Sequence, residues 1–196
     1  MFALIAPRPL IGGIIPDEGA ARWAANAALV LSGSLVLWAS AKIQMPFYPV
    51  PMTLQTLAIM VIAASFGMRL GVATVLLYLA EGAFGLPVFA GTPEKGIGLA
   101  YMIGPTGGYL AGYVLAVALV GWLAERGFDR NMFGLFGAML VGDAVIFALG
   151  IFWLGTLMGW DNPVLDWGLY PFILGDLTKI ALAASAVVAG RRIMRR

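Results

Sequence analysis

The sequence predicts an all-α membrane protein, a bundle of six transmembrane helices with both termini in the cytoplasm. Of its 196 residues, 61% are hydrophobic and 11% are charged, whereas about a quarter of the residues in ordinary soluble domains are charged. The mean hydropathy is +0.93. Long apolar runs alternate with short segments rich in proline, glycine or charge. Residues 1–196 therefore form one integral domain that requires a lipid bilayer around it.

Several classes of chemistry are excluded by residue types that the chain lacks. It contains no Cys and no His, so disulfides, thiolate metal sites and His-dependent nucleophiles are ruled out. None of its three lysines, Lys42, Lys95 and Lys179, lies in a Walker A sequence. A net charge of +2, with basic residues at the membrane boundaries, gives no indication of nucleic-acid binding. The chain is predicted to be neither an enzyme nor an ATPase, and to carry no cofactor.

The N-terminal region consists of a broken segment followed by the first span. Residues 1–19 contain three prolines and two adjacent glycines, which predicts an irregular cytoplasmic arm. The first span covers residues 22–42. Small side chains recur around its start at four-residue intervals and would let another helix approach closely: Ala20, Ala24 and Ala28. Because alanine is common in membrane helices, a stripe without function explains this pattern equally well.

The next two spans are expected to form a short pair. Residues 44–51 include three prolines and two aromatic side chains, which predicts a stiff loop at the membrane interface. Spans at 53–66 and 70–83 follow, separated by a tight turn at residues 67–69. Gln55 stands near the start of the second span and Glu81 near the end of the third. Both polar groups therefore lie toward the same side of the membrane.

The middle of the chain continues with an unusual loop and two longer spans. Residues 84–98 are apolar and rich in glycine and proline, which favours a loop that folds back over a cavity. The fourth span, residues 101–124, has a stripe of small residues expected to serve helix packing: Gly104, Gly108 and Gly112. The fifth span, residues 132–158, contains Asp143, which is expected to be hydrogen-bonded within the bundle.

The last span carries the most informative residues. Pro171 suits the first turn of a helix, so the span should begin near Tyr170. Asp176 and Lys179 then share one face, and Lys179 lies about 13 Å inside the helix end. Charge at that depth costs about 2.5–3.5 kcal/mol, so such residues usually pair and mark a site. The alternative is an internal ion pair that only fixes this helix to its neighbours.

The distribution of basic residues predicts the orientation. Nine arginines lie on one side of the predicted bundle, against only Lys42 and Lys95 on the other, and they are Arg8, Arg22, Arg69, Arg126, Arg130, Arg191, Arg192, Arg195 and Arg196. The positive-inside rule then places both termini in the cytoplasm of a bacterial cell, with the chain in the inner membrane. The two unusual loops and the polar residues of spans 2, 3 and 6 therefore converge on one outward-facing pocket.

Four stretches resemble the BioY family, the biotin-specific substrate-binding (S) components of energy-coupling-factor (ECF) transporters. They are the run Pro51-x-Thr53-Leu54-Gln55-Thr56, the run from Tyr78 to Gly91, the run Gly104-Pro105-Thr106-Gly107-Gly108-Tyr109-Leu110, and Pro171-Phe172-x-x-Gly175-Asp176-x-x-Lys179. The resemblance covers roughly residues 45 to 190, about three quarters of the chain.

The resemblance implies a transport function with defined partners. The bundle would capture biotin from outside and deliver it with a transmembrane T component and two ABC-type ATPases. Ala20, Ala24 and Ala28 would contact the T component. Asp176 and Lys179 match the family's polar pair near the ureido ring, and Glu81 stands where the family's third helix contributes a polar group.

The chemistry of biotin fits these residues. Its ureido head has two N–H donors and one carbonyl acceptor. Either Asp176 or Glu81 would accept from the N–H groups, and Lys179 would donate to the carbonyl. Gln55 lies nearby as a further polar group. Apolar walls would come from four side chains: Phe47, Val50, Phe89 and Tyr101. The carboxylate would lie at the mouth near Lys95, although the loop around Lys95 departs from the family pattern. A reversed pose would place the carboxylate on Lys179.

Two other functions are compatible with the residues. A proton-coupled or facilitative secondary carrier that acts alone would use Asp143, Asp176 and Glu81 as a relay. An intramembrane enzyme would have only these carboxylates and Lys179 for its chemistry.

Overall fold

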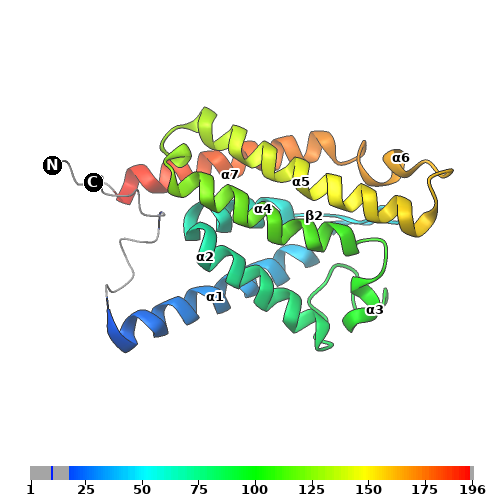
Figure 1. Cartoon of the computed structure of the whole chain (residues 1–196), viewed down its shortest axis with the longest axis horizontal. Helices are drawn as coiled ribbons and strands as arrows, with labels where there is room; N and C mark the ends of the chain where they lie inside the picture. The colour runs from blue at the N-terminus through cyan, green and yellow to red at the C-terminus, as the bar shows by residue number, and fades with distance from the viewer. Residues whose placement is uncertain (1–9, 11–17, 195–196) are drawn as a thin grey trace.

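The protein is built almost entirely of helices, as the computed structural model of residues 10 and 18–194 shows (Figure 1). Its elements are α1 (Gly19–Lys42), β1 (Gln44–Met45), β2 (Met52–Thr53), α2 (Gln55–Ala83), α3 (Gly98–Met102), α4 (Gly107–Glu125), the 3₁₀-helix η2 (Phe128–Arg130), α5 (Met132–Met158), α6 (Val164–Gly168) and α7 (Ile173–Met194). Five helical segments within the described residues are long and apolar enough to cross a membrane, the last comprising α6 and α7 together. The chain is a multi-pass membrane protein. The predicted N-terminal arm lies largely outside the described residues.

Helix α2 folds back on itself at Gly67. This residue has φ 77° and ψ −179°, which no helix contains. Gln55 Nε2 lies 2.8 Å from the Tyr78 hydroxyl, whereas 23 residues of straight helix would separate them by about 35 Å. A Cβ added at Gly71 would lie 3.7 Å from Ala63 Cα. The two halves of α2 are therefore antiparallel neighbours, which confirms the turn predicted at residues 67–69.

Gly67→Ala is expected to destabilise this hairpin. Positive φ with fully extended ψ is a conformation that essentially only glycine adopts, and forcing another residue into it costs about 1–3 kcal/mol. The matched control is Gly137→Ala in α5, where an added Cβ meets nothing within 4 Å. Thermal unfolding in detergent should show a lower midpoint for Gly67→Ala and an unchanged or higher midpoint for Gly137→Ala. Equal midpoints in the two variants would contradict the hairpin geometry.

Helices α4, α5 and α7 run side by side along the length of the molecule, and α1 crosses beneath α2 (Figure 1). Glycines bring the backbones of α4 and α5 together, because a Cβ at Gly112 would lie 2.8 Å from Ile146 Cα and one at Gly108 would lie 2.3 Å from Leu149 O. The predicted packing role is thus confirmed for these two. Gly104 lies outside α4, since residues 103–106 form a turn and the helix begins only at Gly107.

The two ends of the bundle differ in character. The start of α1 and the end of α7 lie at one end, and α3 and α6 lie at the other (Figure 1). At the first end, Arg191 of α7 pairs with Asp129 of η2, and Glu125 accepts a hydrogen bond from Met68 N at 2.9 Å. Toward the second end lie the β1–β2 ribbon, whose Met52 approaches Gly175 of α7, and the segment of residues 84–97, here called the 84–97 loop. Helix α7 begins three residues after Tyr170, because a turn closed by Phe172 N and Leu169 O (3.0 Å) precedes it.

Candidate functional site

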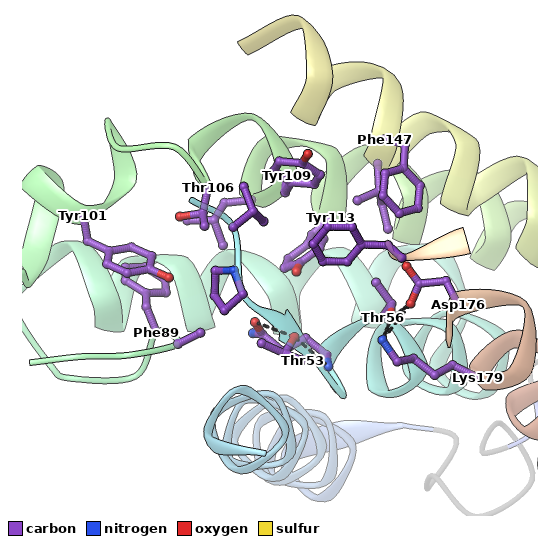
Figure 2. A pocket seen from close by; sticks show the side chains of 17 residues that line it. Thr53, Thr56, Phe89, Tyr101, Thr106, Tyr109, Tyr113, Phe147, Asp176 and Lys179 are labelled. Atoms are coloured by element: carbon purple, nitrogen blue, oxygen red, sulfur yellow. Dashed lines mark hydrogen bonds and ion pairs between the residues drawn. The ribbon is translucent and has the colours of Figure 1, made fainter. Parts of the chain in front are cut away.

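A pocket lies between α2, α4, α5 and α7 and is closed by two loops (Figure 2). Its cavity volume is about 40 Å³, within about 540 Å³ of empty space that includes open space at the mouth. Figure 2 shows an elongated site, with Phe89 and Tyr101 at one end and Asp176 and Lys179 at the other. The lining comprises Val50, Pro51, Thr53, Gln55, Thr56, Phe89, Ala90, Tyr101, Thr106, Tyr109, Leu110, Tyr113, Ile146, Phe147, Phe172, Asp176 and Lys179.

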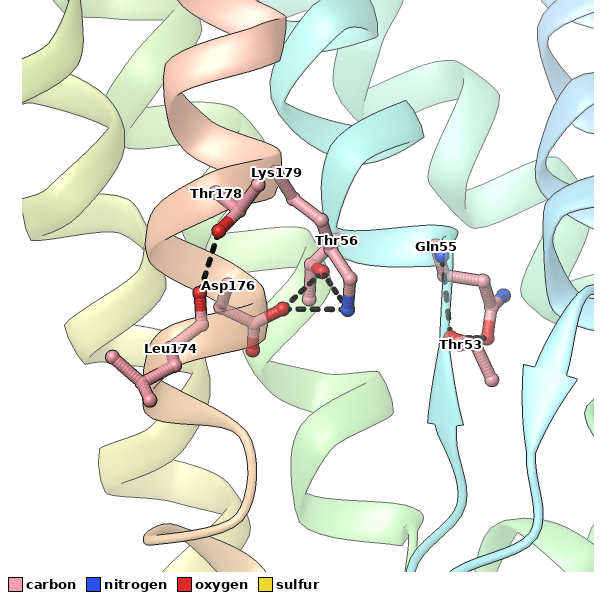
Figure 3. Close-up of polar contacts among 7 residues, drawn as sticks. All are labelled: Thr53, Gln55, Thr56, Leu174, Asp176, Thr178 and Lys179. Atoms are coloured by element: carbon pink, nitrogen blue, oxygen red, sulfur yellow. Dashed lines mark hydrogen bonds and ion pairs between the residues drawn. The ribbon is translucent and has the colours of Figure 1, made fainter.

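Three side chains form a polar cluster at one end of the pocket (Figure 3). Lys179 Nζ donates to Asp176 Oδ1 at 2.7 Å and to Thr56 Oγ1 at 3.3 Å, and Thr56 Oγ1 donates to the same carboxylate oxygen at 2.8 Å. Asp176 is 2% exposed and Lys179 is 8% exposed. Each buried charge compensates the other, and the cluster retains donors and acceptors for a guest.

A second polar chain fixes the middle of the site. Gln55 Nε2 donates to the Tyr78 hydroxyl at 2.8 Å, and that hydroxyl donates to Val88 O at 3.1 Å. The backbone N–H of Gln55 donates to Thr53 Oγ1 at 3.2 Å. The start of α2, its second half and the 84–97 loop are thereby held in one network. Gln55 lines the pocket as expected, but its amide also has this structural role.

Phe89 forms the wall at the other end of the pocket. Its ring stacks on Tyr101 with centroids 4.8 Å apart and meets the edge of Tyr78 at 5.5 Å. The ring lies directly over Gly82, where an added Cβ would be 2.0 Å from Phe89 Cζ. Burial raises the pKa of the Tyr101 phenol.

Four lining aromatics were given no role by the sequence: Tyr109, Tyr113, Phe147 and Phe172. Tyr109 and Tyr113 are one turn apart on α4, and the Tyr109 hydroxyl donates to Gly168 O at 2.8 Å. The spacing of four residues was visible in the sequence. It is not diagnostic there, because α4 is apolar on all sides and its inward face cannot be distinguished.

Three of the predicted site residues lie outside the pocket lining. Glu81 accepts a hydrogen bond from the Ser34 hydroxyl of α1. Phe47 is 39% exposed, and its ring centroid is 6.1 Å from that of Phe172. Lys95 borders a smaller adjoining depression that shares Pro51, Tyr101 and Thr106 with the main pocket. The other six predicted residues do line it, namely Gln55, Val50, Phe89, Tyr101, Asp176 and Lys179.

The structure contradicts the expectation that Asp143 is hydrogen-bonded within the bundle. Its side chain is buried, yet Oδ1 has no hydrogen-bond partner among the described residues. The predicted hydrogen bond within the bundle is therefore wrong, because the α6 and α7 side chains that share its groove, including Leu165, Ile173 and Leu177, are apolar. That groove adjoins the main pocket through Phe147, which lines both, and Asp143 interacts electrostatically with Asp176 and Lys179. Glu81 instead accepts a hydrogen bond from Ser34 of α1. No hydrogen bond links the three carboxylates within the described part of the chain, which disfavours a proton relay among them.

The small residues of α1 lie on a surface. Ala20, Ala24 and Ala28 are exposed, and Trp23 beside them is 78% exposed. Helix α1 packs chiefly against α2 and is the least buried of the long helices in the described chain. An outer face of α1 therefore remains uncovered.

Comparison with known proteins agrees with this architecture. The profile of the BioY family matches residues 17–196. The biotin transporter BioY of Thermotoga maritima is 38% identical over 145 residues, which cover 74% of this chain and 82% of the relative. The biotin transporter BioY of Rhodobacter capsulatus is 40% identical over 147 residues, covering 69% and 75%. These relatives are named as transporters and not as enzymes.

A solved structure shares the fold. The crystal structure of the S-component for biotin from an ECF-type ABC transporter superposes with a TM-score of 0.75 and 26% identity, covering 91% of this chain and 95% of that one. Together with the family match over residues 17–196, this likeness leaves one assignment. The chain belongs to the BioY family.

Proposed function

We propose that this chain binds biotin in the pocket between Phe89 and the Asp176–Lys179 pair, and that it serves as the biotin-specific S component of an ECF transporter. The observation that carries the proposal is a buried carboxylate and ammonium, 2.7 Å apart, at the end of an otherwise aromatic pocket. The named relatives are biotin transporters, and the superposed structure is a biotin S-component.

In the proposed pose, the ureido end of biotin lies against the Asp176–Lys179 pair. Asp176 would accept from the ureido N–H groups, and Lys179 with Thr56 would donate to its carbonyl. The reversed pose would bring the biotin carboxylate beside Asp176, and two buried carboxylates repel each other. The carboxylate instead lies toward the mouth, where Lys95 borders the adjoining depression. Phe89, Tyr101 and Tyr113 then contact the thioether ring and the alkyl chain.

The membrane topology is proposed from the same geometry. The two halves of α2 run antiparallel, so with α1, α4, α5 and α7 they would make six crossings. Arg126, Arg130 and Arg191 lie near the end where α1 starts and α7 finishes. The positive-inside rule assigns that end, and both termini, to the cytoplasm of a bacterial inner membrane. The pocket loops then face outward.

Energy for uptake would come from partners. The sequence has no Walker A lysine, so ATP hydrolysis must be supplied by the two ABC-type ATPases, linked through a T component. The uncovered face of α1, with Ala20, Ala24 and Ala28 exposed, is the surface that we assign to that component, because small residues let a partner helix approach closely.

The test is equilibrium binding of radiolabelled biotin to the purified chain in detergent, without T component or ATPases. We expect saturable binding at one site. Desthiobiotin, which keeps the ureido ring, should compete, whereas lipoate, which keeps an acyl chain and sulfur ring but has no ureido group, should not. Lipoate that competes as well as biotin would show that the polar pair does not recognise the head group. Failure of the wild-type chain to bind biotin would overturn the proposal.

A further inference from the structure

Lys42, the last residue of α1, is bonded to the wall of the pocket. Its Nζ donates to Phe89 O at 3.0 Å, to Thr92 O at 3.2 Å and to Thr92 Oγ1 at 3.0 Å. An ammonium has three N–H donors, so all of them are accounted for by the 84–97 loop. Thr92 is buried, and its hydroxyl donates to Phe89 O at 2.7 Å. One cation thus holds two carbonyls and one hydroxyl of this loop together.

The loop segment that Lys42 holds is part of the ligand pocket. Phe89 and Ala90 line the pocket, and the carbonyl that Lys42 contacts belongs to Phe89 itself. Apart from Lys42, the described side-chain hydrogen bond that attaches this part of the loop to a long helix runs from Tyr78 to Val88 O. Residues 88–92 are therefore tied to the long helices by one described side-chain bond from α2, at Val88, and three from α1, at Phe89 and Thr92.

Helix α1 is also the least buried of the long helices in the described chain. Within its most apolar 18-residue stretch, 28% is buried, against 39–56% in the other four candidate membrane spans. Besides its packing against α2, two polar links of α1 reach this region. Lys42 bonds to the 84–97 loop, and Ser34 bonds to Glu81 of α2, three positions before the loop begins. A shift of α1 would consequently act on both ends of the segment that bears Phe89.

We propose that Lys42 is a positioning residue that couples α1 to the pocket wall. When α1 shifts, the backbone of Phe89 shifts with it. The part that concerns ligand release rests on the proposed function, since it takes biotin as the ligand. In this arrangement Lys42 never touches the ligand. Lys42 bonds to the Phe89 carbonyl. Loss of the Lys42 charge therefore lets the pocket wall at Phe89 move, although no group that lines the pocket has been removed.

The first test needs no ligand. Because the chain contains no cysteine, Glu94→Cys in the exposed part of the loop provides a unique attachment point for a spin label. Glu94 interacts electrostatically with Lys42. Every protein compared carries the same Glu94→Cys replacement, so its effect is common to all of them. Electron paramagnetic resonance should show a more mobile label in Lys42→Met and a wild-type spectrum in Lys42→Arg, which restores charged donors. Arg69→Met, a change at an exposed cation in the turn of α2, is the control and should leave the spectrum unchanged.

The second test measures release. Biotin should dissociate about tenfold faster from Lys42→Met than from wild type, corresponding to the loss of hydrogen bonds to a charged group. Thr92→Val should act in the same direction, and the double variant should be no faster than Lys42→Met, because both changes break one link. The thermal midpoint of ligand-free Lys42→Met should stay close to that of wild type.

The outcomes separate the two proposals. If wild type binds biotin but Lys42→Met matches it in both label mobility and dissociation rate, the coupling is overturned and the binding function stands. If wild type does not bind biotin, the binding function falls, and the spectra of the ligand-free proteins still decide the coupling. A large loss of thermal stability in both Lys42→Met and Lys42→Arg would also overturn the inference, because it would assign Lys42 a purely structural role.

Discussion

Neither Asp176→Asn nor Lys179→Met is expected to retain biotin, and both should be less stable than wild type. Each single change leaves the opposite charge buried and uncompensated, which typically costs about 3–5 kcal/mol when a buried ion pair is broken. Asp176→Asn keeps one acceptor for Lys179 and Thr56, so its loss of stability should be the smaller. Affinity should fall at least about a hundredfold, because two hydrogen bonds to a charged group are worth about 3 kcal/mol.

The double variant Asp176→Asn/Lys179→Gln separates recognition from structure. It removes both charges and keeps groups of similar size that can bond to each other, so much of the stability should return. Biotin binding should not return, because the charged acceptor and donor are gone. Recovery of both properties would mean that the pair only fixes α7 to α2. Thr178→Val is the matched control, since Thr178 is exposed on the same helix and bonds only to Leu174 O of its own turn. Affinity should be measured with radiolabelled biotin and stability by thermal unfolding in detergent.

The polar pair could be predicted from the sequence because charge is conspicuous in an apolar run. Asp176 and Lys179 lie on one face of α7 and meet at 2.7 Å, as their spacing of three residues indicates. The turn at Gly67 could also be predicted, since this glycine and, two positions later, Arg69 interrupt two apolar runs. The start of α4 was wrong by six residues. Residues 103–106 follow the apolar pattern of the span, but their backbone forms a turn that composition does not reveal.

The contacts of the remaining site residues could be identified only from the three-dimensional structure. Glu81 and Tyr78 are only three residues apart, yet Tyr78 bonds to Gln55 and Val88 beside the pocket, whereas Glu81 bonds to Ser34 of α1. A helix that is apolar all round gives no signal for which side faces α1 and which faces the pocket. The same ambiguity hid Tyr113. Lys42 was counted only as a basic residue outside the membrane, because its three acceptors are backbone and hydroxyl oxygens 47 and 50 residues away.

Gly82→Ala is expected to displace Phe89 and weaken biotin binding about tenfold or more. The added Cβ would lie 2.0 Å from Phe89 Cζ and 2.3 Å from Cε2, well inside van der Waals contact. The ring is 1% exposed, stacks on Tyr101 and meets the edge of Tyr78, so it cannot tilt freely. Overpacking of this kind costs about 1–3 kcal/mol of stability. The strain is relieved most readily by movement of the 84–97 loop, which opens the pocket at that end.

Two further variants show whether the effect arises from this contact. Gly137→Ala makes the same change in α5 where the space is open, and it should leave both affinity and the thermal midpoint unchanged or slightly improved. Phe89→Leu in the Gly82→Ala background removes the overlapping ring, so the midpoint should recover. Affinity should recover only in part, because the stacked aromatic wall is lost. If Gly82→Ala binds biotin as tightly as wild type, Phe89 is free to move without opening the pocket, and the fixed wall on which the proposed binding mode depends does not exist.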